Sequence, residues 1–296
     1  MGIVQEYFQH KVEPETKRVC DEIVGSTKVG IEIELENAHH YPKIAGWSTK
    51  QDGSLRNNGV EFVFKTPAGG SLIKRRLDTI RNYIENSANF ETNQRCSVHV
   101  HVDVRDLEWD ELKNFILAYI IAEPFLFQVC GKDRAENIYS LSLYKGTQQL
   151  DLISRFFQIG IEGARLLFRT KYTAFNLKAL IDFGSIEFRG HAGTTDMSKI
   201  LNWTNLLLKL KEFSKEKSVI EHVEEFKHSP IEMLYAIFGA LLPEVDVETL
   251  EETKNNLLNF YKVVYDDEYD DAETQIFANH LGQEQTNKVR ANICVV

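Results

Sequence analysis

The sequence predicts an α+β fold, in which one face of a β-sheet is polar, helices cover its other face, and a helical region follows at the C-terminal end. Two observations support this prediction. Several short segments alternate strictly between apolar and polar residues, which is the pattern of half-buried strands. Between these segments and after them, apolar residues recur at the spacing of amphipathic helices.

The first predicted strand, residues 28–36, has three glutamates on one face. Glu32, Glu34 and Glu36 alternate with large apolar residues, and successive side chains of a strand point to opposite faces. Carboxylates on the same face repel each other, and a cation such as Mg²⁺ between them removes the repulsion. Taken alone, the segment also fits an ordinary strand with a solvated acidic face.

Three further predicted strands repeat this alternation. If all four strands share one sheet, their polar side chains gather on a single face. Carboxylates with imidazoles and without thiolates favour Mg²⁺ or Mn²⁺ over structural zinc. Divalent cations beside arginines favour phosphoryl transfer. The side chains concerned are Glu61 in residues 60–64, His99, His101 and Asp103 in residues 97–104, and Glu187, Arg189 and His191 in residues 185–191.

Helical spacing of apolar residues separates and follows these strands. We expect one catalytic domain over residues 1–215 and a helical extension over residues 216–296 that packs on it. The longest predicted helix should bend at Pro124. The predicted helices cover residues 3–24, 70–88, 106–130, 150–168 and 197–210 and most of 214–265, with a loop at 37–59, a strand at 171–177, a turn at 182–184 and an acidic linker at 266–273.

The composition excludes several classes of protein. With 43% hydrophobic and 26% charged residues, the chain has globular proportions, and its formal net charge of -10 argues against general nucleic-acid binding. We read no apolar run as long enough to span a membrane and no secretion signal at the N-terminus. Neither a P-loop nor a dinucleotide-binding glycine motif is present. Four widely separated cysteines suggest the reduced thiols of a cytoplasmic protein.

Five motifs in a fixed order resemble the amidoligase family, which is related to the catalytic fold of glutamine synthetase and γ-glutamylcysteine ligase. Each motif alone has little specificity, whereas their order and spacing together are specific. The resemblance covers roughly residues 28–210. The motifs are Gly30-x-Glu32-x-Glu34, Trp47 followed by Asp52-Gly53-Ser54-Leu55 and Gly59-Val60-Glu61, His99-Val100-His101-Val102, Arg169-x-x-Tyr172-x-x-x-Asn176, and the segment from Ile186 to Thr194.

The resemblance implies a glutamine synthetase-like fold, with a mostly antiparallel, curved sheet and a polar catalytic groove. It also implies an ATP- and Mg²⁺-dependent ligase, with Mn²⁺ as an alternative cation, that joins a small-molecule or peptide carboxylate to an amine through an acyl phosphate. Homo-oligomers occur among distant relatives. By the same resemblance the metal ligands are Glu32, Glu34, Glu61, His99 and Glu187, the nucleotide contacts are His101, Asn176 and Arg189, the catalytic arginines are Arg189 and Arg169, and the contact for the amine is Asp52.

The sequence also departs from these relatives. It lacks the glycine-rich histidine segment and the separate N-terminal β-grasp domain of glutamine synthetases, so we do not expect glutamine synthesis. Lys65-Thr66-Pro67 follows the second strand where relatives often have a small polar residue or a Ser-Pro pair. Two alternatives stay open: a guanidino-kinase-like phosphotransferase of the same superfamily, and a catalytically inactive interaction module with an acidic groove.

Overall fold

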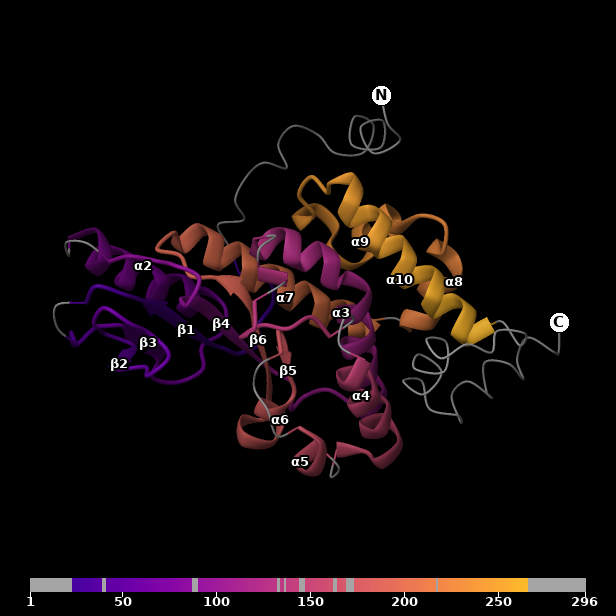
Figure 1. Cartoon of the computed structure of the whole chain (residues 1–296), viewed down its shortest axis with the longest axis horizontal. Helices are drawn as coiled ribbons and strands as arrows, with labels where there is room; N and C mark the ends of the chain where they lie inside the picture. The colour runs from indigo at the N-terminus through magenta and orange to yellow at the C-terminus, as the bar shows by residue number, and fades with distance from the viewer. Residues whose placement is uncertain are drawn as a thin grey trace.

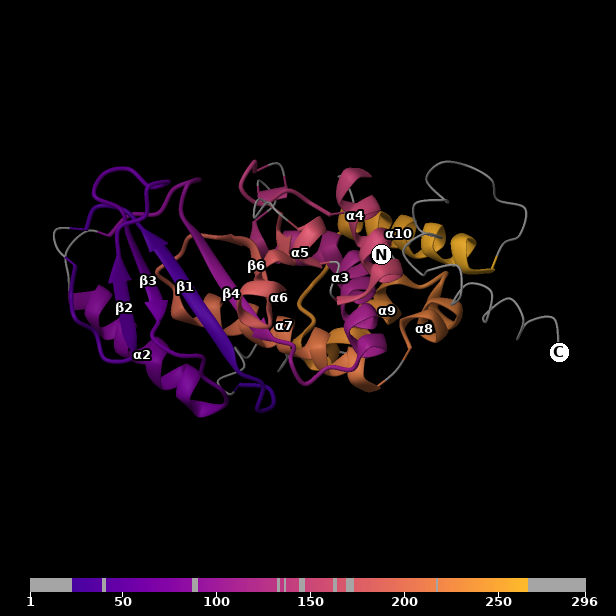
Figure 2. The same ribbon diagram turned by 90° about the horizontal axis from the view of Figure 1, so that it is seen from below.

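The six strands form one antiparallel sheet, which lies in the left half of Figure 1, with the C-terminal helices to its right. The computed structural model describes residues 23–38, 41–86, 90–131, 134–135, 137–143, 147–161, 164–168, 173–216 and 218–265. The strand order is β2-β3-β1-β4-β6-β5, and Figure 2 shows β2, β3, β1 and β4 side by side in this order. The strands are β1 Val29–Leu35, β2 Trp47–Lys50, β3 Val60–Phe64, β4 Ser97–Asp103, β5 Phe175–Asn176 and β6 Ser185–Ala192.

Three helices pack on the apolar face of this sheet: α2 Ser71–Asn86, α3 Trp109–Cys130 and α7 Met197–Glu216. The alternating apolar residues of β1, β3, β4 and β6 are buried against them, as the sequence predicts. Trp47 of β2 donates from Nε1 to the Arg76 carbonyl of α2 at 3.0 Å. The Phe188 ring of β6 lies 5.9 Å from Phe115 and 5.6 Å from Tyr119 of α3. These contacts join both ends of the sheet to the helical layer.

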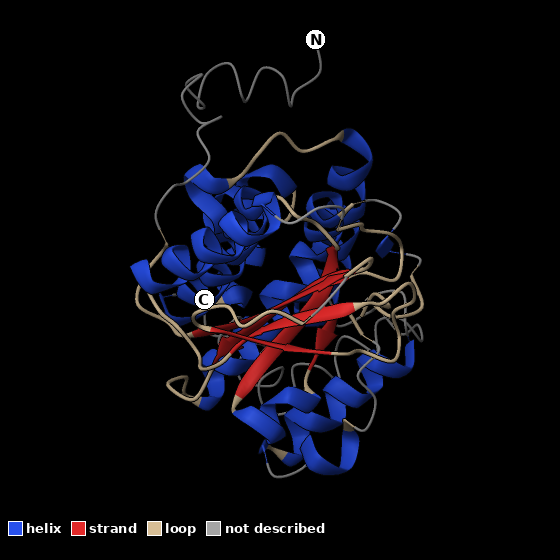
Figure 3. Cartoon of the chain, turned by 90° about the vertical axis from the view of Figure 1, so that its left-hand side faces the viewer, coloured by secondary structure: helices blue, strands red, loops and turns tan. Residues whose placement is uncertain are grey.

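Short helices lie on the other side of the sheet, at its β5–β6 end (Figure 1 and Figure 3). They are α4 Thr147–Ile159, α5 Ala164–Leu167 and α6 Lys178–Phe183. The sequence predicts one helix over residues 150–168, but Gly160, with a φ of 86°, follows the end of α4. A turn is predicted at residues 182–184, whereas α6 fills this connection and ends at Gly184, which has a φ of 67°. Glycine has no Cβ atom and adopts such a left-handed conformation without strain.

The C-terminal helices pack on α3 and α7, and the predicted helical region is helical in the part that the structure describes, up to Tyr265. They are α8 Val219–Phe226, α9 Pro230–Phe238, a 3₁₀ turn at Gly239–Leu241 and α10 Val247–Tyr265. Asn256 donates to the Ile120 carbonyl at 3.1 Å, and Gln128 donates to the Glu244 carbonyl at 2.9 Å. The predicted N-terminal helix, apart from residues 23–24, and the acidic linker at 266–273 lie outside the described residues.

Helix α3 is the one segment of the described residues that is long and apolar enough to cross a membrane, by length and composition alone. From the sequence we expected no apolar segment long enough to span a membrane. Most of the helix is buried against the sheet, α7 and α10. Pro124 lies inside this one continuous helix. A helix in the core of a protein can have the same length and composition, and α3 is buried to the extent expected of such a core helix.

Two further predictions were wrong in detail. The predicted loop at residues 37–59 contains the short strand β2, which pairs with β3 at the edge of the sheet. In β6, Arg189 and His191 were expected on one face, but Val98 pairs with His191 and Val100 pairs with Phe188. Two residues of β6, Arg189 and Gly190, thus lie opposite one residue of β4, His99, which is a β-bulge. The bulge turns the His191 ring toward the helices, 5.7 Å from the Trp203 ring of α7, and burial lowers the pKa of His191 to about 4.

Candidate functional site

The strand register brings most of the polar side chains predicted for the site onto one face of the sheet, opposite α2, α3 and α7. Residues directly opposite on antiparallel strands have Cβ atoms about 5 Å apart. The side chains of β1, β3, β4, β5 and β6 therefore form one contiguous cluster. The directly opposed pairs are Glu34 with Glu61, Glu32 with His99, His101 with Glu187, and Asn176 with Glu187.

His99 is the centre of this cluster. Its Nδ1 atom lies 3.1 Å from Glu32 Oε2 and 3.5 Å from Glu187 Oε1. Its Nε2 atom lies 2.7 Å from the Ser97 hydroxyl, which donates to Glu34 Oε2 at 2.5 Å. His99 and Ser97 are both buried, so these contacts fix the plane of the imidazole ring. Sequence reasoning missed Ser97, although it starts the same polar face two residues before His99.

His101 lies one step along the same face. Its Nε2 atom lies 3.6 Å from Glu32 Oε1 and 3.9 Å from Glu187 Oε1, and its Nδ1 atom lies 3.2 Å from the Ser185 hydroxyl. The ring of Phe183, at the end of α6, meets His101 edge-on at 5.7 Å. Phe183 is 67% exposed, which leaves most of its ring free to contact a ligand. A lone phenylalanine gives no sequence signal for this position.

Arg189 is held beside the carboxylates by Glu187. Its Nη1 atom donates to Glu187 Oε1 at 2.5 Å and lies 3.4 Å from His99 Nδ1. The other oxygen of Glu187 accepts from Asn176 Nδ2 at 2.5 Å. All these side chains are buried, and Arg189 Nε has no hydrogen-bond partner among the described residues. A buried guanidinium with a donor to spare is suited to bind an anion.

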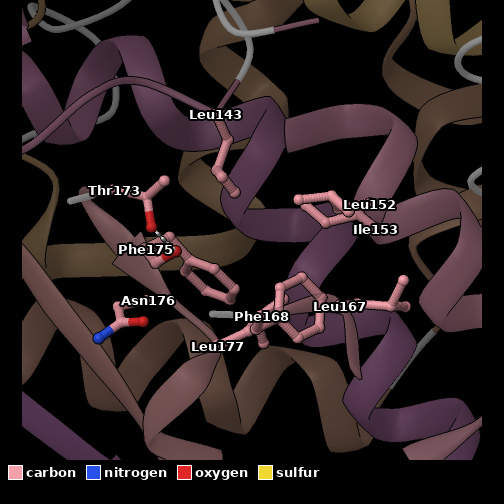
Figure 4. A pocket seen from close by; sticks show the side chains of 9 residues that line it. All are labelled: Leu143, Leu152, Ile153, Leu167, Phe168, Thr173, Phe175, Asn176 and Leu177. Atoms are coloured by element: carbon pink, nitrogen blue, oxygen red, sulfur yellow. Dashed lines mark hydrogen bonds between the residues drawn. The ribbon is translucent and has the colours of Figure 1, made fainter. Parts of the chain in front are cut away.

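Asn176 also lies at the rim of a small apolar pocket that α4 and α5 form behind β5 (Figure 4). Phe175, Phe168 and Leu167 line this pocket, whereas the amide of Asn176 lies at its edge. The pocket is thus part of the core that supports β5. It fixes the strand from which Asn176 reaches Glu187.

Glu61 and Asp52 form the β3 edge of the cluster. Glu61 is buried and lies 2.9 Å from Lys50 Nζ. Asp52 accepts from the backbone N–H of Ser54 at 2.6 Å and from its hydroxyl at 2.5 Å. One oxygen each from Glu34, Asp52 and Glu61 can lie within 4.8 Å of one another. The structure therefore brings Asp52, predicted from a loop motif, to the carboxylates of the sheet.

These donors fit hard divalent cations. Two groups share Glu32: one with Glu61 and His99, the other with His101 and Glu187, and in each the donor atoms lie within 4.8 Å of one another. Because the Ser97 hydroxyl donates to Glu34, His99 Nε2 must donate to Ser97. His99 Nδ1 then faces the carboxylates either as an imidazolium or as a lone pair available to a cation. Carboxylate oxygens with imidazole nitrogens and no thiolate suit Mg²⁺ or Mn²⁺.

The electrostatics of the site divide its carboxylates into two kinds. Burial raises the pKa of Glu32, but hydrogen bonds with His101 and His99 outweigh burial and hold that pKa well below its ordinary value. The pKa of Glu187 is also lowered, because His99 and Arg189 outweigh its burial. Burial and the charge of Glu32 raise the pKa of Glu61 to about 8. At neutral pH the protein without a cation therefore holds a proton on Glu61 beside ionised Glu32.

Two other polar residues of the predicted strands, Glu36 and Asp103, are not part of this cluster. Glu36 is buried and accepts from the Arg56 N–H at 2.7 Å and from Asn57 Nδ2 at 3.1 Å, so it holds the loop after β2. Asp103 accepts from Arg105 Nε at 2.8 Å and Nη2 at 2.6 Å, and Arg105 lowers its pKa. Arg169 lies outside the described residues.

Residues 71–211 match the sequence profile of a protein family described as "putative amidoligase enzyme". This part of the chain, just under half of its length, is similar to the amidoligase family. The amidoligase region contains β4, β5 and β6, and with them His99, His101, Asn176, Glu187 and Arg189. Strands β1 and β3 precede the region and complete the same sheet. No curated protein matches the chain. The family assignment supports an enzyme that forms amide bonds.

Proposed function

We propose that the protein is an ATP- and Mg²⁺-dependent ligase that joins a carboxylate to an amine through an acyl phosphate. The observation that supports this most is the pair of carboxylate–imidazole groups that share Glu32 and lie beside the buried guanidinium of Arg189. Three strands of the same sheet lie in the region that matches the amidoligase family. A glutamine synthetase-like fold for this sheet, with residues 1–215 as the catalytic domain, is part of the proposal. A cytoplasmic location and a homo-oligomer stay predictions.

In this proposal Mg²⁺, or Mn²⁺, is held by the two groups that share Glu32. Glu61 and His99 complete one group, and His101 and Glu187 complete the other. Glu34 supports the first group through Ser97 and, with Asp52 and Glu61, offers one carboxylate oxygen to a further group of possible ligands. When bound, the cations offset the negative charge of the triphosphate and of the phosphoryl group that is transferred.

The protein's own side chains have distinct parts in the first step. A substrate carboxylate oxygen attacks the γ-phosphorus of ATP, the bond from that phosphorus to the bridging oxygen breaks, and ADP leaves with the bonding electrons. Arg189, held by Glu187, donates from Nη and the unpaired Nε to the oxygens on which charge develops. We assign the nucleotide to the His101 side, where Asn176 orders Glu187 and the exposed ring of Phe183 offers a surface for the base.

The second step forms the amide. The amine nitrogen attacks the acyl carbon, the bond from that carbon to the phosphate oxygen breaks, phosphate leaves, and the nitrogen loses a proton. We assign the incoming amine to Asp52, because a carboxylate both attracts an ammonium group and accepts its proton. Ser54 fixes the Asp52 carboxylate through two hydrogen bonds. Arg169 stays a predicted second arginine for the transferred phosphoryl group.

The test is a phosphate-release screen with ATP and Mg²⁺ over amino acids, polyamines, peptides and cell-wall fragments, followed by mass spectrometry. We expect ADP, phosphate and a product whose mass equals two candidates minus one water. Glu32→Gln and Arg189→Lys should abolish this product. Asp103→Asn is the matched control, because Asp103 lies on the same face of β4 but pairs with Arg105.

Two outcomes would contradict the ligase. A stable phosphorylated product without an amide identifies the guanidino-kinase-like phosphotransferase instead. No binding of Mg²⁺–ATP by calorimetry, in the wild type and in Glu34→Gln alike, identifies an inactive interaction module. The cluster disfavours the second outcome, because a chain without catalytic function has no need to bury several carboxylates beside two imidazoles.

A further inference from the structure

A groove of about 570 Å³ lies at the end of the sheet where β4 begins. Its walls are the loop before β4 and residues 137–139 of the connection between α3 and α4. This volume is within the range of sites that hold small molecules. The lining residues are Asn93, Gln94, Arg95, Asn137, Ile138 and Tyr139, and none of them takes part in the site described above.

The groove is joined firmly to the candidate site by Arg134. This buried guanidinium donates to the carbonyl of Gln94 in the groove at 3.3 Å, and to the carbonyls of Arg189 and Gly190 in β6 at 3.3 Å and 3.0 Å. Asn137 also donates to the Gln94 carbonyl, at 3.0 Å. Arg134 therefore links the loop of the groove directly to the strand of Arg189.

The groove is also close to the site along the chain. Ser97, which contacts both Glu34 and His99, follows Arg95 by two residues. Two residues span at most about 7 Å. A ligand of a few residues that lies in the groove can thus extend one end to the Glu34 side of the cluster. The Phe183 side, to which we assign the nucleotide, belongs to the opposite end of β4.

The groove is lined by side chains that suit an anion and by an exposed apolar side chain next to them. Arg95 is exposed and lines the groove. The chain as a whole has a net charge of -10, and the positive charge of Arg95 attracts anions to this part of its surface. Ile138 is 67% exposed beside it, and the side chains of Asn93 and Gln94 supply amide groups. A guanidinium pairs with a carboxylate through two parallel hydrogen bonds.

We propose that this groove binds the free terminal carboxylate of a short peptide. Arg95 holds the carboxylate, Ile138 contacts an apolar side chain of the peptide, and Gln94 hydrogen-bonds its backbone. The assignment of the peptide as a substrate rests on the proposed function: a second carboxylate or amine of the peptide then reaches the cluster. Peptide binding itself does not depend on that function.

Binding is tested with N-acetyl-alanyl-leucine and with the same peptide carrying a C-terminal amide, by saturation-transfer NMR and titration calorimetry of the full chain. We expect the acid to bind at least tenfold more tightly than the amide. Arg95→Gln should remove this difference, and Ile138→Asp should weaken binding of the acid as well. Arg155→Gln is the matched control, because Arg155 is an exposed arginine of α4 that does not line the groove.

Two results would overturn the proposal: equal binding of acid and amide to the wild type, or unchanged binding of the acid by Arg95→Gln. Both residues are exposed, so the variants should keep the thermal midpoint of the wild type, which is measured in parallel. Calorimetry with Mg²⁺–ATP separates this proposal from the proposed function. If the peptide binds in an Arg95-dependent way and Mg²⁺–ATP does not bind, the groove proposal is supported and the ligase is contradicted. If Mg²⁺–ATP binds and peptide binding does not depend on Arg95, the ligase is supported and the groove proposal is contradicted.

Discussion

Glu61 gives the sharpest prediction, because a proton and a divalent cation compete for it. Burial and the charge of Glu32 raise the pKa of Glu61 from 4.5 to about 8. At about 1.4 kcal/mol per pKa unit, this shift corresponds to roughly 5 kcal/mol against ionisation of Glu61. Lys50, 2.9 Å away, offsets only part of the effect. A cation bound between Glu32 and Glu61 must therefore displace about one proton.

We expect the affinity for Mg²⁺ to fall about tenfold for each pH unit below about 8 and to level off above that pH. Titration calorimetry between pH 7 and pH 9, repeated in two buffers of different ionisation enthalpy, measures both the dissociation constant and the protons released. Glu61→Gln keeps the size of the side chain but does not titrate, so its affinity should not change over this range. Equal wild-type affinity at pH 7 and pH 9, with no proton released, would refute the reasoning.

The stability of the metal-free protein should respond to the same group. Because the folded-state pKa of Glu61 is raised, its contribution to the free energy of unfolding is present at low pH and is lost as pH rises through about 8. Thermal unfolding without Mg²⁺ should therefore show a decrease in stability from pH 6 to pH 9 that Glu61→Gln lacks. Mg²⁺ should stabilise the wild type more at pH 9 than at pH 6.

Three further variants test other contacts of the site. Ser97→Ala removes the hydroxyl between Glu34 and His99, so we expect a loss of about 1–3 kcal/mol in urea unfolding and a 10–100-fold weaker Mg²⁺ affinity; unchanged affinity would contradict this. Phe183→Ala should leave the unfolding free energy within about 0.5 kcal/mol and raise the KM for ATP several-fold, and an unchanged KM would remove Phe183 from the nucleotide site. Glu36→Gln should lower stability by about 1–3 kcal/mol without changing Mg²⁺ affinity, since Glu36 holds the loop through Arg56 and Asn57.

Much of the sheet could be predicted from the sequence, because a strict alternation of apolar and polar residues has a local cause. Strands β1, β3 and β4 begin and end within one or two residues of the predicted bounds. Alternation also assigned Glu32, Glu61, His99 and Glu187 to polar faces before any pairing was known. The short strand β2 escaped prediction, because a segment of this length carries too little periodicity, whereas β5 lies within the strand predicted at residues 171–177.

Pairing between strands could not be predicted, since it depends on contacts distant in sequence. The bulge in β6 inserts one residue opposite β4, and this alone moves His191 from the polar face to the Trp203 side. Ser97 and Phe183 joined the site for the same reason: a single serine or phenylalanine has no pattern, and only the folded chain brings them to His99 and His101. The raised pKa of Glu61 likewise arises from Glu32 on a neighbouring strand.

The most direct measurement follows oxygen from substrate to phosphate. A carboxylate substrate found in the screen is labelled with ¹⁸O, incubated with the protein, ATP, Mg²⁺ and the amine, and the released phosphate is analysed by mass spectrometry. Attack of the carboxylate on the γ-phosphorus leaves one ¹⁸O atom in the phosphate when the amide forms. We predict this single label, with the amide in equal amount. Unlabelled phosphate, or label in AMP, would contradict an acyl-phosphate ligase.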